Sequence, residues 1–145
     1  MILKKYFGSL SLTLLGFLFL SCESNESGNL AEKQTELNIE GIKIENIKAT
    51  VVAKMLEENP DLFILDIRTP EEFNLGHIPE AINIDYKADN FESELKKLDR
   101  NQTYLMHCRS GRRSADSLDI FQKLGFSHII HIDDGILGWS KELVK

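Results

Sequence analysis

Short apolar runs recur along the chain from residue 42 onward, and each is bounded by polar residues, glycine or proline. Short runs with few polar positions are typical of strands that are buried on both faces of a sheet. We predict strands at residues 62–67, 81–84, 103–106 and 128–132, with 42–44 as a further candidate.

Amphipathic stretches lie between these runs, as expected for helices that cover a sheet. The first has Val51, Val52, Met55 and Leu56 on its apolar side and ends before Pro60, and the second spans residues 90–98. The third has Ala115, Leu118, Phe121 and Leu124 on its apolar side, Asp116, Asp119 and Lys123 on the opposite side, and Gly125 at its end. Strands that alternate with helices predict an α/β fold: a central parallel sheet of about five strands, flanked by helices on both faces.

The first 22 residues follow a different pattern. Lys4 and Lys5 precede an apolar run over residues 6–20, which ends at Ser21-Cys22. This is the plan of a secretory signal peptide. The run is shorter than the roughly 20 residues that a helix needs to cross a bilayer, which favours a signal peptide over the alternative interpretation, a membrane span. The Ser-Cys end resembles the lipobox of bacterial lipoproteins, although Phe19 stands where leucine is usual, and the resemblance implies that Cys22 is lipidated.

These features predict three parts: a signal peptide over residues 1–21, a lipidated N-terminus with a flexible linker over 22–39, and a folded domain over 40–145. Residues 23–38 are mostly polar, as in spacers that hold a domain away from a membrane. The formal charge of -6 becomes -8 once the two lysines of the signal are removed. An acidic domain of this kind argues against a nucleic-acid partner.

Positive charge is concentrated at one place in this acidic chain. Three of the five arginines, Arg109, Arg112 and Arg113, directly follow Cys108. The cysteine lies just after a predicted strand and before a predicted helix, where open α/β sheets bind ligands. The N–H groups of such a loop form an anion site that stabilises a thiolate. A lone cysteine can also pack as a small apolar group, but its neighbours favour a reactive thiol. With Cys22 lipidated, Cys108 is the only free thiol and no disulfide can form within the chain.

Three segments together resemble the rhodanese family of sulfurtransferases. They are DIRTPEEFNLGHIPEAINI at 66–84, CRSGRRS at 108–114 and DDGILGW at 133–139. The resemblance covers the chain from about Ile42 to Lys145 and implies a parallel sheet flanked by helices. Glu80 and Asp134 stand where family members often have glycine.

The resemblance also implies a mechanism and a set of site residues. The Cys108 thiolate takes sulfane sulfur from thiosulfate or a persulfide and passes it to a thiol, to cyanide, or to a thioredoxin-like protein, without a metal or an organic cofactor. The residues that it implies for substrate binding are Arg109, Ser110, Gly111, Arg112 and Arg113, with Asp66, Arg68 and Ser114 in supporting positions.

Individual side chains in this set have more than one interpretation. Arg109 and Arg112 are the better candidates for substrate contact, because guanidinium groups bind oxyanions. Arg113 could instead pair with a carboxylate such as Asp66. Asp66 and Arg68 could form a buried ion pair that braces the loop.

The four histidines do not form a metal site. Their positions lack metal-ligand spacing, and a single free cysteine excludes the usual zinc patterns. His77 lies in the Gly-His-Ile-Pro segment, a structural turn in the family. His107 is expected to project to the face opposite Cys108. His128 and His131 lie too far along the chain to join the site.

Two other classes of function compete with sulfur transfer. Phosphatase or arsenate reductase activity is the first alternative. Tyrosine phosphatases and the related cell-cycle phosphatases place five residues between the cysteine and a phosphate-binding arginine, but that position here is Ser114 and the arginine comes one residue earlier. A tethered module that carries or senses sulfur with little turnover is the second alternative.

For each of these functions we expect an exported protein, anchored by lipid on the periplasmic side of a bacterial membrane or at the cell surface.

Overall fold

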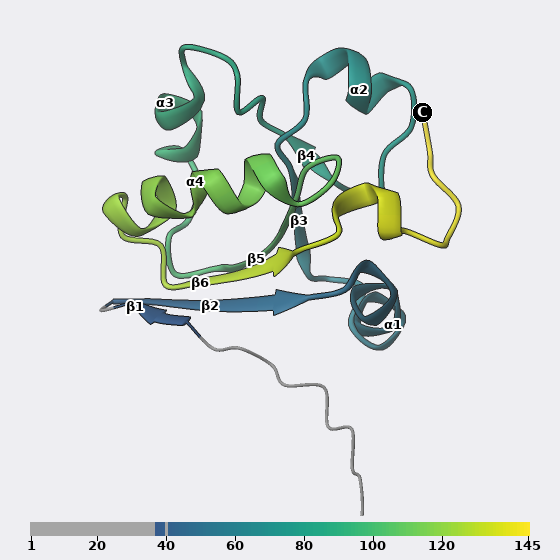
Figure 1. The fold of residues 1–145 in the computed structure, drawn as a ribbon, viewed down its shortest axis with the longest axis horizontal. Helices are drawn as coiled ribbons and strands as arrows, with labels where there is room; N and C mark the ends of the chain where they lie inside the picture. Colours follow the sequence, from purple (N-terminus) through teal and green to yellow (C-terminus); the bar gives the residue numbers. More distant parts are fainter. Residues whose placement is uncertain (1–36, 40) are drawn as a thin grey trace, which may run out of the picture. The chain divides into compact units, whose positions relative to one another are not determined.

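The computed structural model describes residues 37–39 and 41–145. A six-stranded sheet has the order β1-β2-β6-β5-β3-β4, and its strands are β1 (Leu37–Ile39), β2 (Ile42–Ile47), β3 (Phe63–Asp66), β4 (Ile82–Asn83), β5 (Thr103–His107) and β6 (His128–Ile132). Five strands are parallel, and β1 pairs antiparallel with β2 at one edge (Figure 1). The predicted central parallel sheet of about five strands is confirmed.

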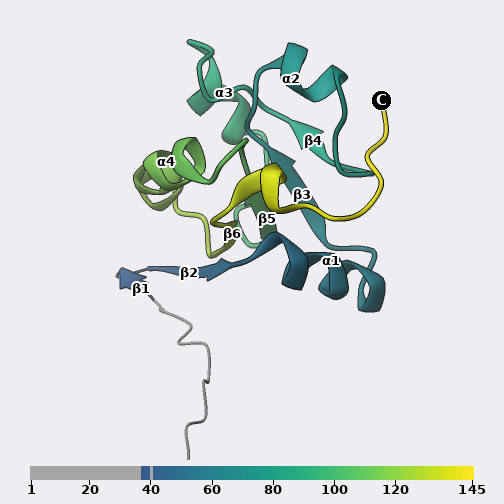
Figure 2. The ribbon, with the colours of Figure 1, turned by 45° about the vertical axis from the view of Figure 1, so that its right-hand side comes forward.

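Helices cover both faces of the sheet, as predicted. They are α1 (Ala49–Glu58), α2 (Pro70–Asn74), α3 (Phe91–Leu95) and α4 (Arg112–Lys123), and a 3-10 helix, η1, spans Gly135–Gly138. Figures 1 and 2 show α1 on one side of the sheet and α3 with α4 on the other. Adjacent strand residues supply the two cores: Leu65 packs in the core under α3 and α4, whereas Ile64 packs in the core under α1.

The buried side of α4 agrees with the prediction at Phe121, which is buried, and at Leu118 and Leu124, which pack against the core. It differs at the start of the helix, where Ala115 is exposed and Ser114 and Ser117 are buried. The two serines are tolerated inside because their hydroxyls have acceptors: Ser114 donates to the Gly111 carbonyl at 2.9 Å, and Ser117 donates to the Ser114 carbonyl at 2.8 Å. The helix ends near Gly125 as expected, where φ is +78°.

The carboxyl ends of three neighbouring strands meet at one edge of the sheet. Asp66 ends β3, His107 ends β5 and Ile132 ends β6, and the β5–α4 loop begins at this edge. Parallel strands therefore bring together residues that are far apart in the sequence.

The predicted signal peptide and Cys22 lie outside the described residues, and residues 37–39 of the predicted linker form β1. Among the helices that the structure describes, none has the length and apolar character needed to cross a membrane. Residues 37–39 and 41–145 belong to one compact unit that contains every described strand and helix. A chain that lacks the predicted signal peptide retains all of these elements.

Candidate functional site

Cys108 lies at the bottom of the β5–α4 loop, with only 1% of its surface exposed. Burial by itself raises the pKa of the thiol. The Ser114 hydroxyl, 3.5 Å from Sγ, and the backbone N–H groups of Ser114, Ser110 and Gly111 oppose this effect and bring the pKa below its ordinary value. The loop thus favours the thiolate, the nucleophilic form of cysteine.

Gly111 gives the loop its shape. Its φ is +84° and ψ is -22°, a left-handed conformation that precedes the first residue of α4. A Cβ atom here would lie 1.8 Å from the carbonyl oxygen of Asp133. Only glycine fits this close contact between the loop and the segment that follows β6.

The segment after β6 also fixes the start of the loop. Ile136 N–H donates to the Cys108 carbonyl at 2.9 Å, and Leu137 N–H donates to the Arg109 carbonyl at 3.1 Å. A Cβ atom on Gly135 would lie 2.5 Å from the Arg109 carbonyl oxygen. Residues 133–137 therefore hold the backbone of the loop in place from Cys108 to Gly111.

Arg113 turns into the body of the protein, and its partner is Glu72 rather than Asp66. Its two terminal nitrogens donate to the two Glu72 oxygens at 2.7 and 2.8 Å. This paired contact holds the pKa of Glu72 at about 2. The pKa of Arg113 is raised, first by its bonds to Glu72 and to a smaller extent by the nearby Cys108 thiolate.

Asp66 is not available to Arg113 because Arg68 occupies both of its oxygens. Arg68 Nε donates at 2.9 Å and Nη2 at 2.6 Å, and both side chains are buried. Nη2 also donates to the Gly76 carbonyl at 2.9 Å. The predicted ion pair is present, and it connects the end of β3 to the turn after α2.

Glu72 is oriented by its own helix. It is the third residue of α2, and the Thr69 hydroxyl accepts its backbone N–H while its carboxylate accepts the Thr69 N–H. This capping box fixes the first turn of α2. The carboxylate that holds Arg113 is therefore itself held by the helix start.

His131 belongs to the site, contrary to the sequence prediction. Its Nε2 lies 2.9 Å from Ser114 Oγ and 3.1 Å from the Gly111 carbonyl oxygen, and its Nδ1 lies 2.8 Å from Oδ1 of Asn46 on β2. The ring is 3% exposed. Burial lowers its pKa, with partial opposition from the Gly111 carbonyl and the Asp133 charge, and so favours the neutral imidazole. The β5–β6 pairing aligns His131 with Met106, and this register explains why a residue distant in sequence reaches the loop.

His107 is fully buried beside the ion pair of β3. Its Nδ1 lies 3.1 Å from the Cys108 carbonyl oxygen, and its Nε2 lies 3.7 Å from Asp66 Oδ2, too far for a hydrogen bond. Burial lowers its pKa, although the Asp66 charge opposes the effect. His107 therefore supports the backbone at Cys108 as a neutral ring.

Arg109 and Arg112, the other two arginines of the loop, differ in their surroundings. Arg109 lines a cavity of about 500 Å³ beside the loop. The remaining lining residues are Arg68, Glu72, Leu75, Gly76, Ile136, Leu137 and Leu143. The Arg112 side chain is 88% exposed and lies 3.9 Å from Asp116 on the next turn of α4. Ser110 is exposed and contributes its N–H to the sulfur.

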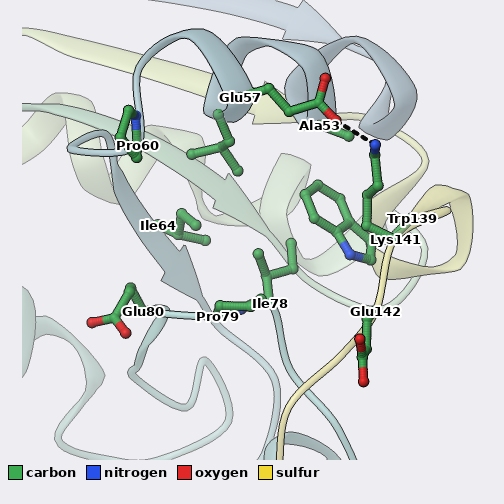
Figure 3. A pocket seen from close by; sticks show the side chains of 11 residues that line it. Ala53, Glu57, Pro60, Ile64, Ile78, Pro79, Glu80, Trp139, Lys141 and Glu142 are labelled. Carbon is green, nitrogen blue, oxygen red and sulfur yellow. Dashed lines mark hydrogen bonds and ion pairs between the residues drawn. The ribbon is translucent and has the colours of Figure 1, made fainter.

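A second cavity, of about 440 Å³, lies on the α1 side of the sheet (Figure 3). Ile64, Ile78 and Trp139 form much of its wall, and an ion pair joins Lys141 to Glu57 across it. Cys108 packs in the core of the other face, so this cavity is separate from the candidate site.

Glu80 and Asp134, where family members often have glycine, do not point at the sulfur. Glu80 has a φ of +64° and lines the second cavity. Asp134 Oδ1 accepts the Ala49 N–H at 2.9 Å at the start of α1. Within residues 41–145, His, Cys, Asp and Glu do not gather into a group of three or more that could hold a metal ion.

Comparisons with known proteins agree with this geometry. Residues 48–142 match the family model described as a rhodanese-like domain. The probable adenylyltransferase/sulfurtransferase MoeZ of Mycobacterium tuberculosis is 34% identical over 88 residues, which are 61% of this chain and 22% of that protein. The putative sulfurtransferase YtwF of Bacillus subtilis is 27% identical over 101 residues, 70% of this chain and 95% of YtwF. The chain thus spans about a fifth of the length of MoeZ and nearly all of YtwF.

A solved structure of a rhodanese-like domain has the same fold. The crystal structure of a rhodanese-like domain protein from Staphylococcus aureus superimposes with a TM-score of 0.61 at 28% identity. The superposition covers 68% of this chain and 95% of that one.

Proposed function

Because this chain belongs to the rhodanese-like domain family, we propose that it is a sulfurtransferase in which Cys108 carries the transferred sulfur. Thiosulfate or a persulfide is the donor, and a thiol, cyanide or a thioredoxin-like protein is the acceptor. The observation that carries the proposal is the surroundings of Sγ: the Ser114 hydroxyl and the backbone N–H groups of Ser110, Gly111 and Ser114, with the positive charge of Arg113 nearby. Sulfurtransferase-named relatives support the same assignment.

Transfer takes place in two displacements. In the first, the Cys108 thiolate attacks the outer sulfur of thiosulfate, an S–S bond forms to Sγ, and sulfite leaves with the electrons of the broken bond. In the second, the acceptor attacks the outer sulfur of the cysteine persulfide, and Sγ leaves as the thiolate. The first thiolate and the persulfide both carry negative charge at the loop, so the fixed N–H donors stabilise each without reorganisation.

The environment of Arg113 argues against a phosphatase or an arsenate reductase. Such an enzyme needs an arginine free to bind the oxygens of the oxyanion, whereas both terminal nitrogens of Arg113 are bonded to Glu72. A carrier or sensor also needs a nucleophilic thiol, so turnover with an acceptor is what separates it from a sulfurtransferase. The loop geometry therefore favours sulfur chemistry over a phosphatase or an arsenate reductase.

We further propose that the domain is exported and anchored by lipid on Cys22, on the periplasmic side of the membrane or at the cell surface. The sequence pattern of residues 1–22 supports this placement. The full chain, expressed in a bacterium, should fractionate with membranes, and Cys22→Ala should release it. An N-terminus that is unmodified and begins at Met1, found by mass spectrometry, would contradict the anchor.

The central experiment follows the sulfur. Mature chain, residues 22–145 with Cys22→Ser, has Cys108 as its only thiol. After thiosulfate, its mass should rise by one sulfur atom, and cyanide should restore the original mass and produce thiocyanate. Cys108→Ser should show neither step, because a hydroxyl does not ionise usefully in the same loop. Hydrolysis of an aryl phosphate without a sulfur adduct would indicate a phosphatase instead.

A further inference from the structure

A chain of polar groups leads from Cys108 into the sheet. The Ser114 hydroxyl oxygen lies 3.5 Å from Cys108 Sγ and 2.9 Å from His131 Nε2, and His131 Nδ1 lies 2.8 Å from Asn46 Oδ1. Cys108, Ser114 and His131 have no more than 3% of their surface exposed. The sulfur is therefore connected, through one hydroxyl, to a titratable ring that is buried with it.

Four different elements supply these residues. Asn46 lies on β2 and His131 on β6, and the register of these neighbouring strands pairs the two residues directly (Figure 1). Cys108 follows β5, and Ser114 lies in the first turn of α4. Only Cys108 and Ser114 are close in sequence, so the connection exists only in the folded domain.

The direction of each hydrogen bond follows from the acceptor at Asn46. Its Oδ1 accepts the Nδ1–H of His131, which leaves a lone pair on Nε2. The Ser114 hydroxyl can then give its hydrogen to Nε2 and accept the S–H of Cys108 on its oxygen. Every contact in this arrangement has one donor and one acceptor, as a path for proton transfer requires.

The surroundings of His131 determine whether its ring can hold a second proton. Burial opposes a positive charge there and lowers the pKa of the ring. The Gly111 carbonyl oxygen, 3.1 Å from Nε2, faces the lone pair of the neutral ring but accepts a hydrogen bond from the protonated one. The Asp133 carboxylate, paired with Lys48 at 3.0 Å, also favours the charged ring. A thiolate at Cys108 supplies the negative partner that offsets burial.

The other titratable groups near the sulfur are poor acceptors for its proton. Arg113 is a guanidinium and already carries its full set of protons. Its partner Glu72 has a pKa of about 2, so this carboxylate is a weak base. The ring of His107 contacts the Cys108 carbonyl oxygen rather than the sulfur. His131 is thus the base that the geometry connects to the thiol.

We propose that His131 is the proton acceptor for Cys108 and acts through the Ser114 hydroxyl, with Asn46 holding the ring in the accepting orientation. The S–H bond breaks as its proton passes to Ser114 Oγ, and the original Ser114 hydrogen passes to Nε2. A thiolate and an imidazolium form, no proton is lost to water, and Ser114 then donates to the thiolate. This inference rests on the proposed sulfurtransferase function, in which Sγ attacks thiosulfate as the thiolate while Nε2 keeps the proton.

The pH dependence of sulfur loading provides the test. The mature chain with Cys22→Ser is mixed with thiosulfate, and the rate constant for the gain of one sulfur atom is measured by mass spectrometry at several pH values between 6 and 9. The variants are Asn46→Leu, Asn46→Asp and His131→Gln, whose amide forms hydrogen bonds but takes up no proton. His128→Gln is the matched control, because His128 lies on the same strand and bonds Glu45 instead. Circular dichroism verifies that each variant is folded.

At pH 6.5 we expect His131→Gln to load sulfur about 10-fold more slowly than wild type. An ordinary thiol of pKa about 8.5 is only about 1% ionised at that pH, and the loop donors alone remain to favour the thiolate. At pH 9 water removes the proton, so the two rates should agree within about twofold. Asn46→Leu should also be slow at pH 6.5, whereas Asn46→Asp keeps an oxygen toward Nδ1 and should restore the wild-type rate. His128→Gln should follow wild type at every pH.

Equal pH profiles for folded His131→Gln and wild type overturn the inference while leaving sulfur transfer intact. A rate that falls by the same factor at pH 6.5 and pH 9 also overturns it, because His131 then supports only the structure of the loop. If His131→Gln does not fold, the two Asn46 variants decide, and identical rates for Asn46→Leu and Asn46→Asp overturn the inference. Failure of wild type to load sulfur at any pH overturns the proposed function and the inference together.

Discussion

The Nε2 atom of His131, on β6, lies 2.9 Å from the hydroxyl oxygen of Ser114, the residue whose hydroxyl also reaches the Cys108 sulfur. The hydroxyl has one hydrogen and three neighbours that can accept it: the sulfur, the Gly111 carbonyl and the imidazole. If Nε2 carries the ring proton, it donates to the Gly111 carbonyl and Ser114 is free to donate to the thiolate. If Nδ1 carries the proton, Nε2 competes for the hydroxyl hydrogen.

The amide of Asn46 governs this choice. Its side chain lies 2.8 Å from Nδ1, and an amide presents either an oxygen acceptor or an NH₂ donor, depending on its orientation. In the structure Oδ1 faces Nδ1, which places the ring proton on Nδ1 and makes Nε2 a competitor for the Ser114 hydrogen. A flipped amide, with its NH₂ toward Nδ1, would place the ring proton on Nε2 and leave the Ser114 hydrogen to the sulfur. Asn46 and His131 are thus positioning residues for Ser114.

Ser114→Ala should raise the pKa of Cys108 by about one unit, because a hydrogen bond to a charged group contributes about 1.5 to 3 kcal/mol and this one is long. The pKa is measured from the pH dependence of alkylation by iodoacetamide. Ser117→Ala, which removes a buried hydroxyl one turn along α4, is the control and should leave the profile in place. If the alkylation rates of Ser114→Ala and wild type show the same pH dependence, the Ser114 hydroxyl does not stabilise the Cys108 thiolate.

His131→Leu should make the domain less sensitive to mild acid. The pKa of His131 is lower in the folded protein than in the unfolded chain, so the unfolded state binds more protons as the pH drops below about 6.5. Stability is therefore present above that pH and is lost as the pH falls toward the folded pKa, by at most about 1.4 kcal/mol per pH unit for each such histidine.

Urea unfolding at several values between pH 7.5 and 5 measures this slope. Burial also lowers the pKa of His107, so His131→Leu should lose only part of the dependence of the unfolding free energy on pH. His77→Asn, at a half-buried ring that stacks on Phe73, is the control. A slope identical to wild type in His131→Leu would contradict the assignment of a neutral buried ring.

Glu72→Gln should lower the free energy of unfolding at pH 7 by about 1 kcal/mol, a value reduced for the partial exposure of the pair. The pKa of Glu72 is about 2 in the folded protein, below its ordinary value, because of Arg113. Its contribution is therefore full above about pH 4.5 and disappears as the pH falls toward 2. The difference between wild type and variant should narrow over this range in urea titrations. Glu58→Gln, on the last turn of α1, is the control; a constant difference at every pH would contradict the ion pair.

Gly111→Ala should destabilise the domain far more than Gly125→Ala. Both glycines have similar left-handed backbone angles, +84° and +78°, so both variants incur the strain of a side chain there, about 1 kcal/mol or more. A Cβ atom meets nothing within 4 Å at Gly125 but meets the Asp133 carbonyl at 1.8 Å at Gly111. Thermal unfolding and Cys108 alkylation rates provide the two measurements. Similar melting temperatures for the two variants would show that the loop can move away from Asp133.

The fold was predictable because the apolar runs that mark buried strands are local features of the sequence. The buried side of α4 was not, since Ser114 and Ser117 are polar residues whose hydroxyls find acceptors inside, and hydropathy assigns such positions to solvent. The predicted apolar side was therefore right at Phe121 and wrong at Ala115.

The site was predictable only where its residues are close in sequence. Cys108 and the loop after it form a continuous segment, and the Asp66–Arg68 pair spans two residues. The partner of Arg113 and the role of His131 depend on which strands are neighbours and on their register, and neither is encoded in the hydropathy pattern. The order β6-β5-β3 brings residues 131, 108 and 66 to one edge of the sheet.

The bond between Ala49 N–H and Asp134 joins residues 85 positions apart, and the same short segment, through Ile136, holds the carbonyl of Cys108. An incomplete chain that stops before this segment lacks the clamp that shapes the loop, and its cysteine is an ordinary thiol. We therefore expect the pKa of Cys108 to fall to its native value only after these long-range contacts have formed. The pH dependence of Cys108 labelling during refolding would report when the native topology is complete.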